Sequence, residues 1–280
     1  MIGLTKYPST ILVQRLDGTI YDLEKLDIRV LQFEPPSANY QHTMEQIGKY
    51  GKQFTETTIG ERIIPFKVDV FATDTYDVVL QRQRLFDIFE SNEDFYVYDI
   101  RQSALRWRVR AEQQPFAFYE NYYLGGDISF NLICADGYAE SVATSQTPFT
   151  YEAESWEIGM NIPNGEDLHY SFSTPSFQVR NLSSIPILAT ERPYKIIFKG
   201  VAAGLRIKNT TTDQEFIFNK AIGSGDEFYL FGAWPFLNGS ACYSDGNHQF
   251  IDLVKGINSF EISGYQQIDE ISIDTHFYYG

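Results

Sequence analysis

The chain has 280 residues, of which 43% are hydrophobic and 21% charged, a balance typical of a globular protein with room for one large or two ordinary domains. The 37 acidic and 22 basic residues give a net charge of −15, which argues against tight nucleic-acid binding, because neutralising phosphates requires clustered Lys and Arg. No apolar stretch approaches the roughly 18 residues of a membrane span, and the N-terminus lacks the apolar core of a secretion signal, so we expect no membrane insertion.

The first half predicts short strands around a single helix. Asp17-Gly18 stands between two apolar-alternating runs, the strongest short-range signal for a β-hairpin. Residues 74–90 contain no Gly or Pro, apolar residues recur there at helical spacing, and Asp74 suits the N-cap of a helix. The predicted strands of this half are residues 11–16, 19–23, 59–71, 95–99, 105–112 and 126–134.

The second half predicts strands alone. The polar, proline-containing stretch TSQTPF at residues 144–149 suits a domain boundary, which gives domains 1–145 and 146–280. Short strands at intervals near ten residues favour a β-sandwich. These strands are residues 149–156, 168–172, 176–181, 194–199, 205–209, 215–219, 227–231 and 259–263. The predicted fold class is therefore mainly β, with an α+β N-terminal half that carries one helix, followed by the sandwich.

One strand combines an apolar and a strongly basic face. In LRWRVR, residues 105–110, Arg106, Arg108 and Arg110 alternate with Leu, Trp and Val. Strict alternation points the arginines away from the core that the apolar residues fill, so replacing all three by Glu should leave the fold intact. The arginines either form a solvated strand face or meet an acidic partner.

The residues show no active site. Motifs for zinc proteases, serine hydrolases and phosphate-binding loops are absent, and we expect no catalytic residue, cofactor or metal. Cys134 and Cys242 lie 108 positions apart and are interpreted as free, reduced thiols. One group of aromatic residues forms either a sugar-stacking platform or core and interface contacts. This group is Trp156, Tyr229, Trp234 and Tyr243.

The order of several short motifs is informative. In the first half, Asp17-Gly18-Thr19 is followed by IGKYGKQ at 47–53, the strand 62–71, the helix opened by DTYD, and CADGYAES at 134–141. In the second half the motifs are VRNLSSIPI, PYKIIFKG, TTTDQEF, GDEFYL, LNG and GINSFEI. In this order they resemble the distal tail proteins (Dit family) of siphophages that infect Gram-positive bacteria, and the resemblance spans nearly the whole chain.

The resemblance implies a structural virion protein at the distal end of the phage tail, assembled in the host cytoplasm, and not an enzyme. It implies a homo-hexamer whose N-terminal domains form a ring and whose galectin-like β-sandwiches project outwards. Such a ring joins the major tail (tube) protein to the tail-tip protein, in many phages holds receptor-binding proteins, and lets DNA pass through its channel without specific binding. A closed ring also needs two complementary subunit faces, and Arg106, Arg108 and Arg110 would suit one of them.

Two other functions stay open. A carbohydrate-binding module that recognises host cell-wall glycans is the main alternative, because sandwiches of this kind often bind sugars. A glycan-degrading enzyme of the tail tip is the other, although the chain lacks a recognisable catalytic constellation. Sugar-binding assays and the particle mass would distinguish these functions.

Overall fold

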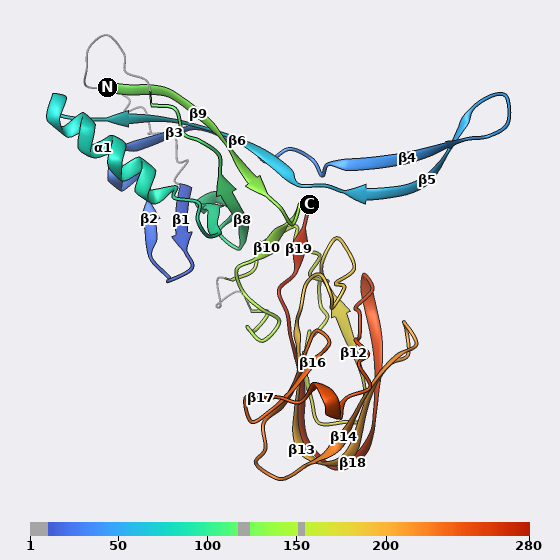
Figure 1. Ribbon diagram of the computed structural model, residues 1–280. Helices are drawn as coiled ribbons and strands as arrows, with labels where there is room; N and C mark the ends of the chain where they lie inside the picture. Colours follow the sequence, from blue (N-terminus) through green and yellow to red (C-terminus); the bar gives the residue numbers. More distant parts are fainter. Residues whose placement is uncertain (1–10, 117–123, 151–154) are drawn as a thin grey trace. The chain divides into compact units, whose positions relative to one another are not determined.

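The computed structural model describes residues 11–116, 124–150 and 155–280 (Figure 1). It divides the chain into two compact units, one up to Glu140 and one over Ser141–Tyr279. Residues just before the predicted boundary at 145/146 belong to the second unit, because Ser145 Oγ donates a hydrogen bond to the carbonyl of Ile273 at 2.6 Å. We expect residues 146–280 to fold on their own as a β-sandwich.

The first unit contains the described α-helix and most of the predicted strands. Its elements are β1 (Ile11–Arg15), β2 (Ile20–Asp22), β3 (Ile28–Phe33), β4 (Tyr40–Gln46), β5 (Lys52–Ile59), β6 (Arg62–Phe71), α1 (Thr75–Ile88), β7 (Phe95–Asp99), β8 (Leu105–Ala111) and β9 (Leu124–Cys134), with β10 (Ala139–Ser141) at its end. Seven strands form an antiparallel sheet in the order β2-β1-β7-β8-β9-β6-β3. The predicted Asp17-Gly18 hairpin is confirmed, since the Arg15 N–H donates to the Thr19 carbonyl at 2.8 Å.

Helix α1 begins and packs as predicted. The Asp74 carboxylate caps it by accepting hydrogen bonds from the backbone N–H groups of Tyr76 and Asp77, at 2.9 and 2.8 Å. Leu85 and Ile88 of the helix are buried in the core of the unit. Just after the helix, the Phe89 ring packs against Phe66 of β6 and Phe130 of β9, at centroid distances of 5.4 and 5.1 Å. The helix therefore covers the face of the sheet around β6 and β9.

Strands β4 and β5 form a separate two-stranded sheet, which the sequence analysis did not predict. The predicted strand 59–71 is confirmed as β6 from Arg62 onwards, whereas its first residue, Ile59, ends β5. Every residue of β4 and β5 is exposed. Figure 1 shows this ribbon extending away from the sheet of the first unit, and we call it the arm (Tyr40–Ile59).

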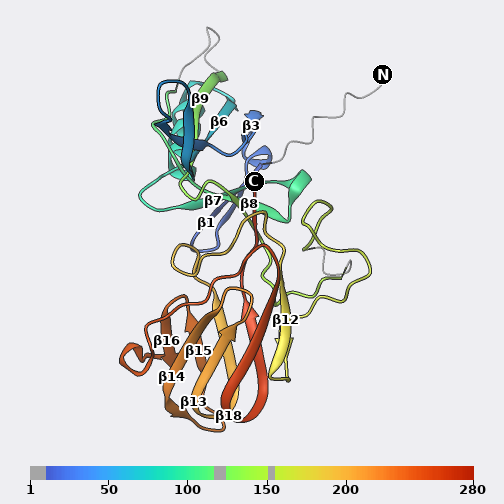
Figure 2. The same ribbon diagram turned by 90° about the vertical axis from the view of Figure 1, so that its right-hand side faces the viewer.

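The second unit is built around two long strands. Its elements are β11 (Ser171–Phe172), β12 (Ser176–Asn181), β13 (Lys195–Asn209), β14 (Gln214–Ile222), β15 (Phe228–Phe231), β16 (Trp234–Leu237), β17 (Ser240–Ala241), a short 3-10 helix (Tyr243–Asp245), β18 (Gly256–Asp274) and β19 (Tyr278–Tyr279). The predicted strands 194–199 and 205–209 are one continuous strand, β13, with register shifts in its middle. One half of β13 pairs with β15 and the other with β14, while β18 runs along both halves (Figure 2).

The predicted fold class is confirmed: the described residues are mainly β, with a single α-helix in the first half. The strand predicted at 149–156 runs through residues 151–154, which lie outside the described residues. At its two ends, the rings of Phe149 and Trp156 stack at 4.3 Å. The core of the second unit contains large apolar side chains that are at most 5% exposed. They include Phe198, Leu205, Ile207, Phe216, Phe218, Phe228, Phe260, Ile262, Ile271 and Ile273.

Candidate subunit and partner interface

Strand β8 carries the arginine stripe (Arg106, Arg108 and Arg110). Val109, between two of the arginines, is 1% exposed and lies in the core, and Trp107 packs against the core from its margin. The arginines therefore share the opposite face of the strand, as the alternation predicts. Each of them has a carboxylate of its own chain as a partner, but the three environments differ.

Arg106 is a structural residue of the first unit. Its Nε donates to Glu140 Oε1 at 2.7 Å, and the two side chains are only 14% and 13% exposed. Its guanidinium also lies 3.8 Å from the centre of the Tyr96 ring, a cation–π contact. Burial first, and then the Glu140 charge, raise the pKa of Tyr96. Arg106 is thus paired on both sides and offers little free charge to a partner.

Arg108 and Arg110 share one carboxylate. Asp94 accepts a hydrogen bond from Arg108 Nε at 2.7 Å and from Arg110 Nε at 2.6 Å, while the two arginine side chains stay 48% and 55% exposed. Burial alone would raise the pKa of Asp94, but the hydrogen bonds from Arg110 and Arg108 outweigh it and lower that pKa. Burial alone would lower the pKa of Arg108, but the hydrogen bond and charge of Asp94, and then the charge of Asp136, outweigh it and raise that pKa. Both guanidinium groups nevertheless stay about half exposed at this end of the stripe.

A further arginine, Arg62, lies on the apolar side of β8, against Trp107. Arg62 is 2% exposed, and its guanidinium stands over the rings of Trp107 and Tyr138, at 4.9 and 5.7 Å. Among the described residues its Nε and Nη2 atoms have no hydrogen-bond partner. Burial is the main reason why the pKa of Arg62 is lowered. Trp107 therefore does more than fill the core, because its ring compensates a buried cation.

The arm has one apolar and one polar face. Tyr40 pairs with Ile59, His42 with Thr57, and Met44 with Phe54, and these pairs share one side of the ribbon. Exposed fractions on this side are 57% for Tyr40, 49% for Met44, 63% for Phe54 and 38% for Ile59. A register shift after Thr43 inserts one extra residue opposite, which keeps Phe54 on the side of His42, and their rings are 5.2 Å apart.

The opposite side of the arm carries polar residues only. Its paired positions are Gln41 with Thr58, Thr43 with Glu56, and Glu45 with Gln53. At the tip, within the IGKYGKQ motif, Ile47 N–H donates to the Gly51 carbonyl at 3.1 Å, and the Tyr50 side chain is 80% exposed. The motif thus forms the turn of the arm. The signal that sequence reasoning missed is the alternation of Tyr40, His42 and Met44 before this turn.

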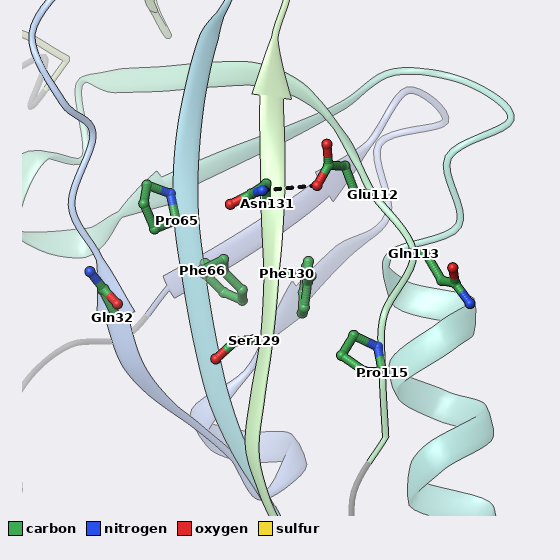
Figure 3. A pocket seen from close by; sticks show the side chains of 9 residues that line it. All are labelled: Gln32, Pro65, Phe66, Glu112, Gln113, Pro115, Ser129, Phe130 and Asn131. Atoms are coloured by element: carbon green, nitrogen blue, oxygen red, sulfur yellow. Dashed lines mark hydrogen bonds between the residues drawn. The ribbon is translucent and has the colours of Figure 1, made fainter.

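A depression of about 550 Å³ lies on the first unit, between β3, β6, β9 and the segment that follows β8 (Figure 3). Glu112 is the one titratable side chain among the described residues that line it. Glu112 accepts a hydrogen bond from Asn131 Nδ2 at 2.9 Å, and Figure 3 shows the two side chains facing each other. Catalysis by paired acid and base needs a second titratable group, so this depression offers none of that chemistry.

The His, Cys, Asp and Glu side chains of the described residues are not clustered as metal ligands are. Within 11–116, 124–150 and 155–280, no group of three His, Cys, Asp or Glu residues could hold a metal ion. Cys134 and Cys242 are free thiols. In the part of the chain that the structure describes, no helix has both the length and the apolar character needed to cross a membrane.

The four aromatic residues considered as a sugar platform are not all together. Trp156 stacks on Phe149 and donates its indole N–H to the carbonyl of Pro148 at 3.1 Å. Trp234 and Tyr243 are in ring contact at 4.6 Å, and Tyr229 lies on β15, which pairs with the strand of Trp234. The structure therefore brings three of the four to one hairpin region and separates Trp156.

Comparisons with known proteins agree with this architecture. Residues 16–134 match the family of phage tail protein RIFT-related domains. The chain is similar to the crystal structure of the Dit protein of phage SPP1, described as a paradigm of the hub adsorption apparatus in Gram-positive infecting phages, with 13% identity, a TM-score of 0.70, and coverage of 95% of this chain and 99% of that chain. It is also similar to a chain of the phage p2 baseplate in its activated conformation with Sr, with 9% identity, a TM-score of 0.51, and coverage of 95% and 97%. No curated protein sequence matches the chain.

Proposed function

We propose that this chain is a structural hub protein of a phage tail tip. Two findings support the proposal: residues 16–134 match the family of phage tail protein RIFT-related domains, and the chain has the fold of the SPP1 Dit protein. In this proposal six copies form a closed ring at the distal end of the tail tube. The ring joins the major tail protein to the tail-tip protein, provides attachment for receptor-binding proteins, and leaves a channel for DNA. Its role is assembly, not catalysis.

The observation that carries the proposal is the unpartnered apolar face of the arm. An isolated two-stranded ribbon is at best marginally stable in water, and this one exposes Tyr40, Met44, Phe54 and Ile59 on the same side. Large exposed apolar faces mark sites of protein–protein contact. In a ring with heterologous contacts, each subunit can cover this face with a different surface of its neighbour, and the contact closes by rotation.

The exposed arginines support the same proposal. The chain carries a net charge of −15, so copies of it repel one another unless their contacts bring opposite charges together. Arg108 and Arg110 both pair with Asp94 and keep about half of each side chain exposed, and we propose that they face acidic groups of a neighbouring subunit or of another tail protein. Acidic residues elsewhere in the ring would let DNA pass without sticking.

Two adjacent residues of the arm provide a matched test. Phe54 lies on the apolar face, and Gln53 lies on the polar face opposite Glu45, where a lysine gains a favourable cross-strand partner. Native mass spectrometry of the full chain, across a range of concentrations, should find particles of six times 32.2 kDa for the parent and for Gln53→Lys. Phe54→Lys should remain monomeric at the same concentrations. A parent that is monomeric at every concentration, or a Phe54→Lys variant that assembles like Gln53→Lys, would contradict the proposal.

A further inference from the structure

The hairpin of β15 and β16 carries aromatic rings on its outer face. Phe228 and Leu230 of β15, and Pro235 and Leu237 of β16, are buried on the inner face. The other face carries Tyr229 opposite Phe236 and Phe231 opposite Trp234. The outer face of an antiparallel sheet is normally polar, so four rings there need an explanation. This hairpin is the FGAWPF region, and Figure 2 shows the two strands side by side.

The rings lie against one another and remain accessible. Tyr229 and Phe236 stack with a centroid distance of 4.8 Å and an interplanar angle of 12°. Phe231 is 37% exposed and Trp234 is 53% exposed. On the neighbouring strand, the Lys195 ammonium group lies 5.5 Å from the centre of the Tyr229 ring. The hairpin therefore presents flat ring faces with a cation beside them.

A loop extends this surface with two more rings. Tyr243, which is 40% exposed, packs on Trp234 at 4.6 Å, and His248 packs on Tyr243 at 4.2 Å. The aromatic platform thus comprises Tyr229, Phe231, Trp234, Phe236, Tyr243 and His248.

The loop that holds Tyr243 and His248 is anchored to the strands beneath it. Asn247 accepts a hydrogen bond from the Ile217 N–H at 3.1 Å and donates one to the Glu215 carbonyl at 3.0 Å. The Cys242 N–H donates to the carbonyl of Pro235 at 2.8 Å. Fixed rings lose little conformational freedom when a ligand binds, so the aromatic platform is preorganised for binding.

We propose that the aromatic platform is a saccharide-binding surface. A pyranose ring has a face of C–H groups, which packs on an aromatic ring, and a rim of hydroxyl groups, which needs hydrogen-bond partners. The platform supplies both. Its rings contact one another at interplanar angles of 12°, 34° and 33°. Their polar groups are the Trp234 indole N–H, the His248 imidazole, and the Tyr229 and Tyr243 hydroxyls, with the Lys195 ammonium group nearby.

The charge of the platform also favours this ligand class. None of its six side chains is a carboxylate, although the chain as a whole is strongly acidic; the charged groups beside it are the Lys195 ammonium group and Asp245 of the loop that carries Tyr243. With one cation and one anion beside the rings, the surface suits neutral saccharides. Anchors of protein interfaces are different, since they become fully desolvated in a pocket of the partner. Rings that already stack on their neighbours cannot insert in that way.

The proposal can be tested by calorimetric titration of the full chain. The ligands are cello-, malto- and chito-oligosaccharides and glycan strands released from peptidoglycan. We expect at least one of these saccharides to bind, Trp234→Ala to weaken that binding at least about tenfold, and Trp234→Tyr to retain most of it, because a flat ring is kept. Trp234→Leu keeps apolar bulk without a flat face and should behave like Trp234→Ala. Tyr265→Ala is the matched control, since Tyr265 is also an exposed ring of the same unit (37%, against 53% for Trp234) and lies outside the platform.

Three outcomes would overturn the proposal: no saccharide binds the parent, Trp234→Ala binds as the parent does, or Tyr265→Ala loses as much affinity as Trp234→Ala. Self-association that Trp234→Ala abolishes, without saccharide binding, would assign the platform to a second copy of the chain instead. The proposed ring is tested separately, because its readout is the particle mass and its variants lie in the first unit.

Discussion

Arg106 and Glu140 form a largely buried ion pair, joined by two contacts of 2.6 and 2.7 Å from the guanidinium to Oε1. The same strand carries Arg108 and Arg110, whose side chains are about half exposed. The arginine stripe is therefore divided between one residue that stabilises the first unit and two that are available to a partner. The expectation that all three tolerate replacement by Glu stays a prediction for Arg108 and Arg110, and the buried pair leads us to expect a loss of stability at Arg106.

Arg106→Glu should destabilise the first unit by about 3 kcal/mol, because it leaves Glu140 without its cation and adds a second carboxylate beside it. Thermal and denaturant unfolding of the full chain should show an early transition. The double variant Arg106→Glu with Glu140→Arg, which restores opposite charges, should recover part of the loss. Equal stability of Arg106→Glu and the parent would show that the pair contributes nothing to folding.

Arg108→Glu combined with Arg110→Glu should leave the chain folded, because both side chains are about half exposed and ion pairs of this kind contribute only about 0–1 kcal/mol each. Assembly should weaken, and more so at low salt, where like charges are poorly screened. Sedimentation at two ionic strengths, with circular dichroism as the control for folding, measures both effects. Unchanged assembly at low salt would make the two arginines a solvated strand face.

The free energy of unfolding should depend on pH in a way that reflects the ionisation of Asp94. Its pKa is lowered in the folded chain, so its contribution is present above the unfolded-state pKa of about 3.9 and is lost as the pH falls through the lower folded value. Asp94→Asn removes this contribution at every pH. The parent should therefore be more stable than Asp94→Asn by roughly 1 kcal/mol near neutrality, and the difference should shrink as the solution is acidified towards about pH 3. A difference that is constant with pH would exclude the carboxylate as its cause.

Two asparagines of the motifs that carried the family resemblance, Asn181 of VRNLSSIPI and Asn258 of GINSFEI, are structural, together with Asn209 just before TTTDQEF. Asn181, Asn209 and Asn258 are at most 2% exposed. Asn209 Nδ2 donates to the Asp252 carbonyl at 2.8 Å and to Asn258 Oδ1 at 3.1 Å, and Asn181 Nδ2 donates to the Leu253 carbonyl at 3.2 Å. These amides satisfy the backbone carbonyls of Asp252 and Leu253, which lie outside the named strands. The motifs therefore predicted the fold, and they contain one residue of the aromatic platform, Tyr229 of GDEFYL.

Sequence patterns predicted buried strands well and exposed ones poorly. Strands β7 and β12 lie where they were predicted, because their alternation reflects one face in the core. The arm was missed although Tyr40, His42 and Met44 alternate with polar residues, because all its residues are exposed and the register shift interrupts the alternation on β5. Strand β18 was predicted only over residues 259–263, since the residues that follow, from Ser263 to Gln267, are all exposed. The partners of the arginines could not be predicted either, because each lies far away in the sequence: Glu140 is 34 positions from Arg106, and Asp94 is 14 and 16 positions from Arg108 and Arg110.

The two thiols should differ sharply in reactivity. Burial is the main cause that raises the pKa of Cys134 to about 11, whereas Cys242 is partly exposed. The thiolate is the reactive form, and at about pH 8 only about one in a thousand Cys134 side chains would be ionised. A disulfide reagent should therefore modify one thiol of the native chain and two after denaturation. Cys242→Ser should show no rapid reaction in the native state, and a rapid one would contradict the burial of Cys134.

The pairing of β13 with β18 shifts register between Ala202 and Arg206, and we expect the register there to depend on Gly264. A Cβ built on Gly264 would lie 1.9 Å from the carbonyl oxygen of Gly204, a backbone atom that cannot move aside. Gly239 is the matched control, because it has the same φ of 74° but nothing within 4 Å of such a Cβ. Gly239→Ala carries only the conformational cost of a left-handed residue, about 1 kcal/mol, whereas Gly264→Ala adds a clash that should bring its cost to about 3 kcal/mol or more. Denaturant unfolding of the two variants, followed through the transition of the second unit, measures the difference. Equal stabilities would mean that β13 and β18 can separate at this point without loss of stability. The close approach of Gly204 and Gly264 would then not determine the register shift.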